Sequence, residues 1–155
     1  MIIQTEIEIS APPMKVWRAL CDFGSYPKWN PCREVIGVAG LGEKVTLMIG
    51  LNPEKRHRMP ATINVFEPGR LLSFRTGRAL LSKDLESFSL EPGRRGTLLR
   101  HSAELRGLST LLMPRKWFEP RLLSVYQEVD RALEKYVTTG ARLKATSPKR
   151  RRTRF

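Results

Sequence analysis

One amphipathic stretch, residues 120–138, constrains the fold of this chain more than any other segment. Its apolar side chains recur at steps of three and four, which is the spacing of one face of an α-helix. They are Leu122, Val125, Tyr126, Val129, Leu133, Tyr136 and Val137. Pro120 suits the first helical turn, and Gly140 suits a stop just past the end. Such a helix is about 28 Å long, roughly enough to cross a small sheet, so we expect a β-sheet to cover its apolar face.

Short segments in which apolar and polar residues alternate predict that sheet. They are residues 2–9, 33–38, 44–49, 57–66, 71–76, 84–90 and 97–106. Turn residues such as Pro68-Gly69 and Pro92-Gly93 separate them closely, which indicates antiparallel pairing of successive strands. Residues 14–20 predict a short helix, and residues 22–31 predict an aromatic-rich turn. This order predicts an α+β fold, with helices on one face of a curved antiparallel sheet.

Length and composition indicate one domain with a single core, because the chain has 155 residues of which 41% are hydrophobic. No apolar run reaches the length of a transmembrane helix, and no signal peptide is visible at the start. We therefore expect a cytoplasmic protein. Cys21 and Cys32 fit no zinc spacing, so we expect two free thiols.

The positive charge is unevenly distributed. The formal net charge is +13, and residues 141–155 supply seven basic side chains and no acidic one. We expect a domain over residues 1–140 and a disordered basic tail over residues 141–155. The tail residues that could bind phosphates of nucleic acid or an anionic membrane are Lys149, Arg150, Arg151, Arg152 and Arg154. The alternative is a solvated tail with no specific partner.

Several motifs together resemble a known superfamily. They are Ala11-Pro12-Pro13 before the short helix, Tyr26-Pro27-Lys28-Trp29-Asn30-Pro31, the turn Pro68-Gly69-Arg70, and the strand that opens at Gly96-Thr97. Over residues 2–138 the chain resembles the START/Bet v 1-like (SRPBCC) superfamily, close to its polyketide cyclase/dehydrase-like branch. The resemblance implies a helix-grip fold, in which a seven-stranded antiparallel sheet curls around the C-terminal helix and encloses an apolar cavity.

The resemblance also implies a function and a place for certain residues. Members bind lipids, sterols, polyketides and other hydrophobic molecules, and some catalyse cyclisation or dehydration. Tyr26, Trp29 and Asn30 map near the cavity mouth or brace it. Similar sequences often carry an acidic residue where Ala103 stands, so this chain departs from the pattern there. We expect the ligand cavity to be lined by Trp29, Ile63, Val65, Phe74, Phe88, Leu99, His101, Leu122, Tyr126, Val129 and Leu133.

The candidate catalytic residues are His101 and Glu86. The strand phases place both histidines, His57 and His101, on the helix side of the sheet, where a neutral imidazole can act as a general base. Glu86 shares the phase of Phe88, and His101 on a nearby strand could be its partner. The plainer alternatives are a hydrogen-bonded core histidine and a Glu86 that reaches solvent. The histidines have no recognisable metal-ligand spacing, and no cofactor motif is present, so we expect no metal and no cofactor.

The strongly apolar segment 108–118 leaves its role open. It could form a cavity lid, a dimer surface or a membrane-touching loop, or it could pack onto the start of the long helix. Three function hypotheses follow for the whole chain, which we expect to be a monomer or a homodimer. The first is binding of a small lipid-, polyketide- or aromatic-like ligand in the cavity. The second is a cyclase/dehydrase-like enzyme that uses the His101–Glu86 pair. The third is anion binding through the basic tail.

Overall fold

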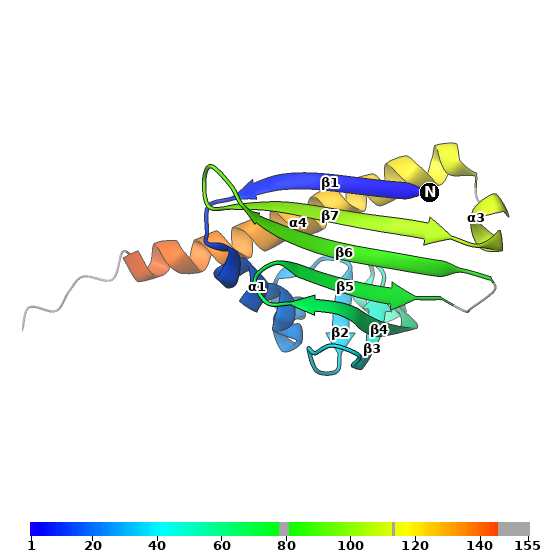
Figure 1. The fold of residues 1–155 in the computed structure, drawn as a ribbon, viewed down its shortest axis with the longest axis horizontal. Helices are drawn as coiled ribbons and strands as arrows, with labels where there is room; N and C mark the ends of the chain where they lie inside the picture. The colour runs from blue at the N-terminus through cyan, green and yellow to red at the C-terminus, as the bar shows by residue number, and fades with distance from the viewer. Residues whose placement is uncertain (78–80, 113, 146–155) are drawn as a thin grey trace, which may run out of the picture.

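One curved antiparallel sheet and one long helix make up most of the computed structural model, which describes residues 1–77, 81–112 and 114–145. The sheet has seven strands in the order β1-β7-β6-β5-β4-β3-β2 (Figure 1). They are β1 (Ile2–Ile9), β2 (Arg33–Ile36), β3 (Lys44–Ile49), β4 (His57–Glu67), β5 (Leu71–Thr76), β6 (Lys83–Pro92) and β7 (Thr97–Arg106). All neighbours pair antiparallel, so the α+β helix-grip architecture is confirmed.

The first and last strands of the chain lie side by side, which the succession of hairpins alone does not require. β1 pairs with β7 over its whole length, from Ile2 opposite Glu104 to Ile9 opposite Thr97. The chain then crosses to the far edge of the sheet through α1 (Pro13–Cys21), η1 (Phe23–Ser25) and α2 (Tyr26–Trp29), and it enters β2 there. The other short helices are η2 (Pro53–Lys55) and α3 (Leu108–Leu112).

The long helix α4 (Arg115–Ala145) is longer at both ends than residues 120–138. It crosses one face of the sheet (Figure 1). Pro120 lies inside it, in the second turn, where its missing N–H removes one intrahelical hydrogen bond without ending the helix. Gly140 does not end it, because a glycine within a helix costs only about 1 kcal/mol relative to alanine and helix-forming residues follow. The boundaries expected from these two residues are therefore wrong, although the helix itself is present.

A bulge in β4 changes which side chains face the helix. Ile63 pairs with Phe74, but Val65 pairs with Ser73, so Asn64 is the extra residue. Beyond it the phase is reversed, and Phe66 turns toward α1, where its ring lies 5.0 Å from that of Trp17. The expectation that Val65 shares the inward side of Ile63 is therefore wrong, because a bulge inserts one residue and shifts every later side chain to the other face.

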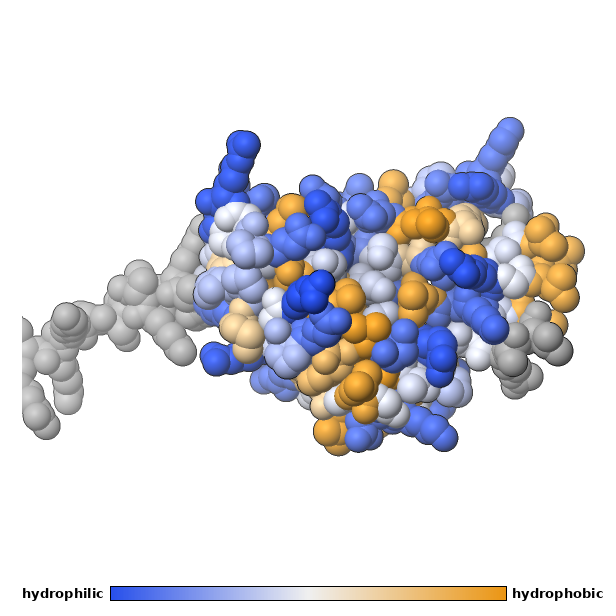
Figure 2. Space-filling model, viewed as in Figure 1, coloured by the Kyte–Doolittle hydropathy of each residue, from blue (hydrophilic) through white to orange (hydrophobic). Residues whose placement is uncertain are grey.

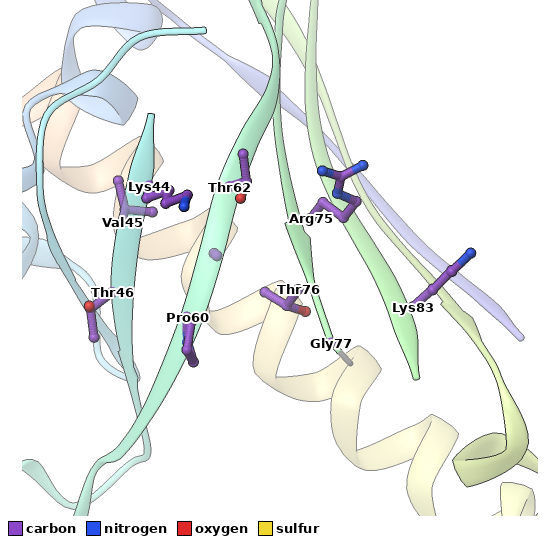
Figure 3. A pocket seen from close by; sticks show the side chains of 10 residues that line it. Lys44, Val45, Thr46, Pro60, Thr62, Arg75, Thr76, Gly77 and Lys83 are labelled. Atoms are coloured by element: carbon purple, nitrogen blue, oxygen red, sulfur yellow. The ribbon is translucent and has the colours of Figure 1, made fainter. Parts of the chain in front are cut away.

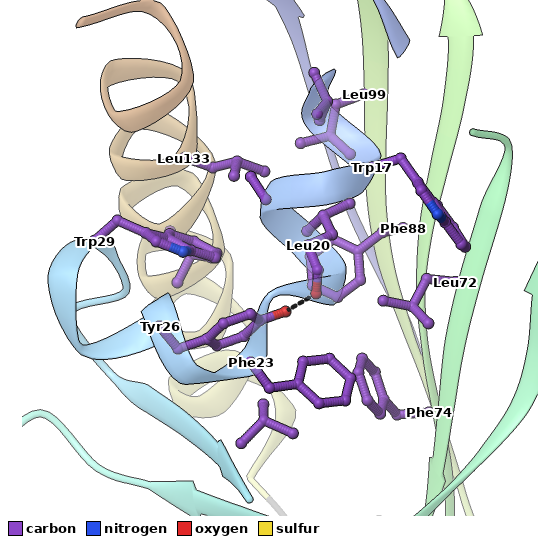
Figure 4. Close-up of a cluster of buried hydrophobic side chains, with 14 of the residues drawn as sticks. Trp17, Leu20, Phe23, Tyr26, Trp29, Leu72, Phe74, Phe88, Leu99 and Leu133 are labelled. Carbon is purple, nitrogen blue, oxygen red and sulfur yellow. Dashed lines mark hydrogen bonds between the residues drawn. The ribbon is translucent and has the colours of Figure 1, made fainter. Parts of the chain in front are cut away.

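The core fills the space between the sheet, α1, α2 and the second half of α4 (Figure 4). Its centre is aromatic: Phe23 lies edge-on to Tyr26, and the Tyr26 hydroxyl donates a hydrogen bond of 2.7 Å to the carbonyl of Leu20. Seven of the residues expected to line a cavity are packed into this core instead: Trp29, Ile63, Phe74, Phe88, Leu99, Val129 and Leu133. This end of the molecule is therefore closed by side chains.

Two further expectations concern the cysteine thiols and the presence of a transmembrane helix. Cys21 and Cys32 are both free thiols, and burial raises the pKa of each. Within the described part of the chain, no helix is both long and apolar enough to cross a membrane.

Candidate functional site

A cavity of about 430 Å³ lies between the inner face of the sheet and the first half of α4. Its wall is mostly apolar, and six polar side chains interrupt it: Arg33, Thr76, Asp84, Glu86, Thr110 and Tyr126. The apolar lining comes chiefly from Leu47, Ile49, Leu51, Met59, Leu85, Ala103, Leu105, Phe118, Leu122 and Val125. Of the side chains expected in such a cavity, Leu122 and Tyr126 are the two that line it.

The polar wall is organised by an ion pair between two buried side chains. The Arg33 guanidinium donates to both carboxylate oxygens of Glu86, with N–O distances of 2.9 and 2.7 Å. Arg33 is the first residue of β2 and Glu86 lies in the middle of β6, so the pair joins strands that are far apart in the sheet. The two parallel hydrogen bonds fix the plane of the carboxylate as well as its position.

Behind this pair, His101 links the sheet to α4. Its Nε2 lies 2.9 Å from Glu86 Oε1, and its Nδ1 lies 2.9 Å from Asp130 Oδ1. The other Asp130 oxygen accepts a hydrogen bond from the Thr5 hydroxyl on β1. The contact between His101 and Glu86 agrees with the predicted strand phases. Glu86 is buried, so the alternative that its carboxylate reaches solvent is wrong.

The imidazole is also held from its two faces. The Phe88 ring stacks at 4.2 Å with an interplanar angle of 21°, and the Tyr126 ring stacks at 4.0 Å with an angle of 11°. His101 is only 1% exposed, and it does not line the cavity. Since both ring nitrogens and both faces are occupied, His101 is placed to brace Glu86 and Asp130 rather than to reach a ligand.

The charges of this cluster balance when His101 is protonated, because two carboxylates then face two cations. Burial alone would lower the pKa of His101, but hydrogen bonds and charge from Asp130 and Glu86 outweigh it and raise the pKa. Burial alone would raise the pKa of Glu86, but Arg33 and His101 outweigh it and lower the pKa to about 2. Glu86 is therefore an anion at neutral pH and a weak base.

Three ionisable side chains of the wall, Arg33, Tyr126 and Asp84, have groups that remain for a ligand in the cavity. Arg33 Nε is buried and has no hydrogen-bond partner within the described residues, so it can donate to an acceptor. Tyr126 lines the wall, and burial together with the nearby Glu86 carboxylate raises the pKa of its hydroxyl, which stays protonated. Asp84 stands where β6 begins, and partial burial raises the pKa of its carboxyl.

Sequence reasoning missed three members of the cluster: Thr5, Arg33 and Asp130. The sequence contained hints that two of them are buried. Thr5 shares the inward phase of Ile3, and Asp130 stands within the apolar stripe of the helix, between Tyr126 and Leu133. Arg33 shares the phase of Val35 in β2, but an arginine at the end of a strand is expected to be exposed to solvent unless a buried partner is known.

Other candidates do not join the site. His57 lies opposite Ile49 and shares the face of Met59, as the strand phase predicted, but it is exposed at the start of β4 and does not line the cavity. Tyr26 and Asn30 brace the core, and Asn30 Oδ1 accepts a hydrogen bond from the Cys32 backbone N–H at 3.1 Å.

The expected anion-binding residues of the tail, Lys149, Arg150, Arg151, Arg152 and Arg154, lie outside the described residues. Within residues 1–77, 81–112 and 114–145, no group of three or more His, Cys, Asp or Glu side chains is arranged so that it could hold a metal ion.

A second hollow, of about 660 Å³, lies on the outer face of the sheet (Figure 3). Lys44, Arg75 and Lys83 line it together with three threonines, and its lining includes no acidic residue. Lys44, Arg75 and Lys83 alternate with the inward-facing side chains along β3, β5 and β6, whereas Thr76 lines both this hollow and the cavity.

Comparisons with known proteins agree with the architecture. The family model described as "Polyketide cyclase / dehydrase and lipid transport" matches residues 2–139. No curated protein sequence matches the chain. A solved protein from Nitrosomonas europaea, NE0264, is similar with a TM-score of 0.74 and 15% identity, covering 92% of this chain and 97% of that one. A Staphylococcus aureus protein of unknown function, SA2116, has a TM-score of 0.73 and 12% identity, with 92% and 96% coverage. Ara h 8.0201 has a TM-score of 0.69 and 16% identity, with 90% and 98% coverage.

Proposed function

Since the chain belongs to the polyketide cyclase/dehydrase and lipid transport family of the SRPBCC superfamily, we propose that it binds a small hydrophobic molecule between its sheet and α4. The observation that carries this proposal is the cavity of about 430 Å³, apolar over most of its wall and bordered by the Arg33–Glu86 pair. Small-molecule sites commonly have volumes of about 300–1,000 Å³ and combine an apolar lining with a few polar groups.

The polar side chains of the cavity wall limit the charge that a ligand can carry. Arg33 is fully engaged with Glu86 except at Nε, and Glu86 accepts from both Arg33 and His101. A ligand that carried a full charge would disturb this balanced cluster, whereas a neutral acceptor such as a carbonyl or hydroxyl oxygen can take the free Nε–H. The proposed ligand is therefore a lipid-, polyketide- or aromatic-like molecule with an apolar body and one neutral oxygen.

The test is a pair of neighbouring substitutions on β7. Ala103 lines the cavity, and Ala103→Leu places three more carbon atoms inside it. Ser102 is the adjacent residue on the outer face, so Ser102→Leu makes a comparable change outside the cavity. Binding of the neutral fluorescent probe N-phenyl-1-naphthylamine is measured for both variants, and native mass spectrometry of protein from its own host identifies what it retains.

Ala103→Leu is expected to weaken probe binding at least about tenfold, because the added side chain occupies the volume that the probe needs. Ser102→Leu is expected to bind as the unmodified chain does. Equal binding by both variants would place the probe elsewhere and would contradict the proposal.

A cyclase- or dehydrase-like reaction is the second candidate, and the position of Asp84 favours it. This carboxyl lines the cavity with a raised pKa, as a proton-transfer group requires, whereas Glu86 and His101 are fully engaged with their partners. Once a bound molecule is identified, Asp84→Asn should abolish its turnover and leave its binding within about threefold. Unchanged turnover would remove Asp84 from the reaction.

A further inference from the structure

Five exposed leucine and tryptophan side chains gather at one end of the molecule. Leu108, Leu111 and Leu112 lie on α3, Trp117 lies in the first turn of α4, and Leu81 precedes β6; together they form what we call the mouth patch. Leu111, Leu112 and Trp117 are 79%, 87% and 70% exposed. The alternative that this segment packs onto the start of the long helix is therefore wrong for these three side chains.

Two segments of the patch that are distant in sequence, Leu81 and α3, lie side by side, and α4 starts at the same end of the molecule (Figure 1). A Cβ added to Gly107, the residue before α3, would lie 2.6 Å from the carbonyl oxygen of Leu81. α3 therefore begins directly beside Leu81. Figure 2 shows apolar side chains collected at the end of the molecule where Figure 1 draws α3.

The patch borders the opening of the cavity. Thr110 of α3 lies between Leu108 and Leu111, Phe118 of α4 directly follows Trp117, and both Thr110 and Phe118 line the cavity. Leu51 also lines the cavity and is itself exposed, so apolar side chains occupy more than one side of the opening. Whatever covers the patch therefore also covers the entrance of the proposed ligand site.

Basic residues outnumber acidic ones in the sequence next to this apolar surface. Arg106 is paired with Glu104 and Arg115 with Glu119, so the excess positive charge of residues 104–121 comes from Lys116 and Arg121. The guanidinium of Arg121 lies 5.7 Å from the centre of the Trp117 ring, so cation and aromatic ring are presented together. An exposed apolar surface with flanking cations and a tryptophan complements a lipid bilayer with anionic headgroups.

We propose that the mouth patch docks onto an anionic lipid bilayer, with Leu111, Leu112 and Trp117 inserted at the level of the headgroups. The cavity then opens toward the membrane, and its ligand enters from the lipid phase. The docking surface does not depend on the identity of the ligand, but the route of entry rests on the proposed function.

Trp117 provides a direct readout, because the other two tryptophans, Trp17 and Trp29, are only 5% and 7% exposed. The full chain is mixed with vesicles of phosphatidylcholine that contain about a quarter phosphatidylglycerol, and with pure phosphatidylcholine vesicles. Docking is expected to shift tryptophan emission to shorter wavelength with the anionic vesicles. Brominated lipid should quench that emission.

The matched variants are Leu111→Glu with Leu112→Glu, and Leu41→Glu. Leu41 is also an exposed leucine (69%), but it lies in the connection between β2 and β3. The double variant is expected to lower vesicle affinity at least about tenfold, because two apolar side chains no longer insert, while Leu41→Glu leaves it unchanged. A serine version of the double variant, with the same expected direction, is used if the glutamate version fails to fold by circular dichroism.

Three results would overturn the inference. Binding without quenching of Trp117 would assign the contact to the basic tail or the outer hollow. Equal affinity of the double variant would do the same. A concentration-dependent emission shift without vesicles, with a dimer by light scattering, would make the patch a contact between two copies of the chain. Ala103→Leu should lose the neutral probe and keep vesicle binding, so failure of the ligand proposal and failure of docking are distinguishable.

Discussion

At the scale of single residues, the unusual feature is a chain of hydrogen-bonded polar side chains, four of them ionisable, buried beside an apolar cavity. Thr5, Asp130, His101, Glu86 and Arg33 are linked in that order by hydrogen bonds, and all five are buried. Burying one such charge alone is very unfavourable, and only a complete set of partners makes it tolerable. The cluster therefore behaves as one unit whose members cannot be changed independently.

The first prediction concerns pH. The raised pKa of His101 means that its contribution to stability is fully present below its ordinary value of about 6.5 and is lost as pH rises through the raised value. The lowered pKa of Glu86 means that its contribution is present above its ordinary value of 4.5 and is lost as pH falls toward about 2. The free energy of unfolding should therefore be highest between these ranges and fall on both sides.

Urea denaturation between about pH 6 and pH 8.5 measures the alkaline side. His101→Gln should be less stable and should lose the decline over this range. His57→Gln, which removes the exposed histidine, should keep it. A flat profile for the unmodified chain would show that His101 is not charged in the folded protein.

The second prediction concerns Arg33. Arg33→Met leaves the Glu86 carboxylate without its guanidinium, and we expect a loss of roughly 3–5 kcal/mol in the free energy of unfolding. Arg100→Met is the control, because Arg100 also contacts two carboxylates, of Glu6 and Glu91, but on the exposed face of the sheet. Its loss should be much smaller, since solvent screens exposed pairs. Similar losses in both variants, measured by urea denaturation, would contradict a special role for the buried pair.

At the scale of elements, hydrogen bonds at two places hold the helices against the sheet. α4 anchors to the sheet through Asp130, which reaches both His101 on β7 and Thr5 on β1. The chain passes from β1 into α1 through Ala11, whose carbonyl accepts a hydrogen bond of 2.6 Å from the Thr97 hydroxyl at the start of β7. The turn between β6 and β7 is thus tied to the passage that carries the chain to the opposite edge of the sheet.

The third prediction tests that tie. Gly96 has a φ of +150°, and a Cβ there would lie 2.6 Å from the Ala11 carbonyl oxygen and 2.8 Å from its nitrogen. Gly96→Ala should therefore lower the free energy of unfolding by about 2 kcal/mol or more, because backbone must move on both sides. Gly24→Ala is the control, since the nearest atom to its added Cβ is 3.9 Å away, and thermal unfolding should find it nearly unchanged. An equal effect of the two substitutions would show that the close approach at Gly96 is unimportant.

At the scale of the whole molecule, the two ends of the space between sheet and helix are built differently. The end beneath α1 and α2 is filled by aromatic and aliphatic side chains (Figure 4). The end near α3 retains the cavity and presents the mouth patch to solvent. A well-packed end stabilises the domain, so the other end can remain hollow without loss of the fold.

The fourth prediction follows from that division. Ala103→Leu fills part of the hollow end, so the free chain should gain about 0.5–2 kcal/mol in stability while it loses the neutral probe. N-phenyl-1-naphthylamine should raise the melting temperature of the unmodified chain but not that of Ala103→Leu, because a ligand stabilises only a folded protein that binds it. Differential scanning calorimetry with and without probe measures both effects. A variant that is less stable than Ser102→Leu would mean that the space at Ala103 is already filled.

Much of this organisation followed from the sequence, because it depends on local periodicity. Alternation over residues 2–9, 44–49, 71–76 and 97–106 predicted β1, β3, β5 and β7 with their observed bounds, and the three-four spacing predicted the helix that crosses the sheet. Strand phase placed His101 and Glu86 on the inward face, but it left open whether Glu86 pairs with His101 or reaches solvent, and their contact is a finding of the structure. The combination of motifs around Tyr26 and Gly96 identified the superfamily and its helix-grip fold.

Only the tertiary structure decided where the space remains and which charges meet. Asp130, Arg33 and Thr5 come from a helix and two edge strands, and no local pattern states that they converge on His101 and Glu86. The bulge at Asn64 reversed the facing of Val65, and side-chain volume rather than periodicity determined that seven expected cavity residues became core. Periodicity is a property of neighbours along the chain, whereas a cavity is what packing leaves between elements that are distant in sequence.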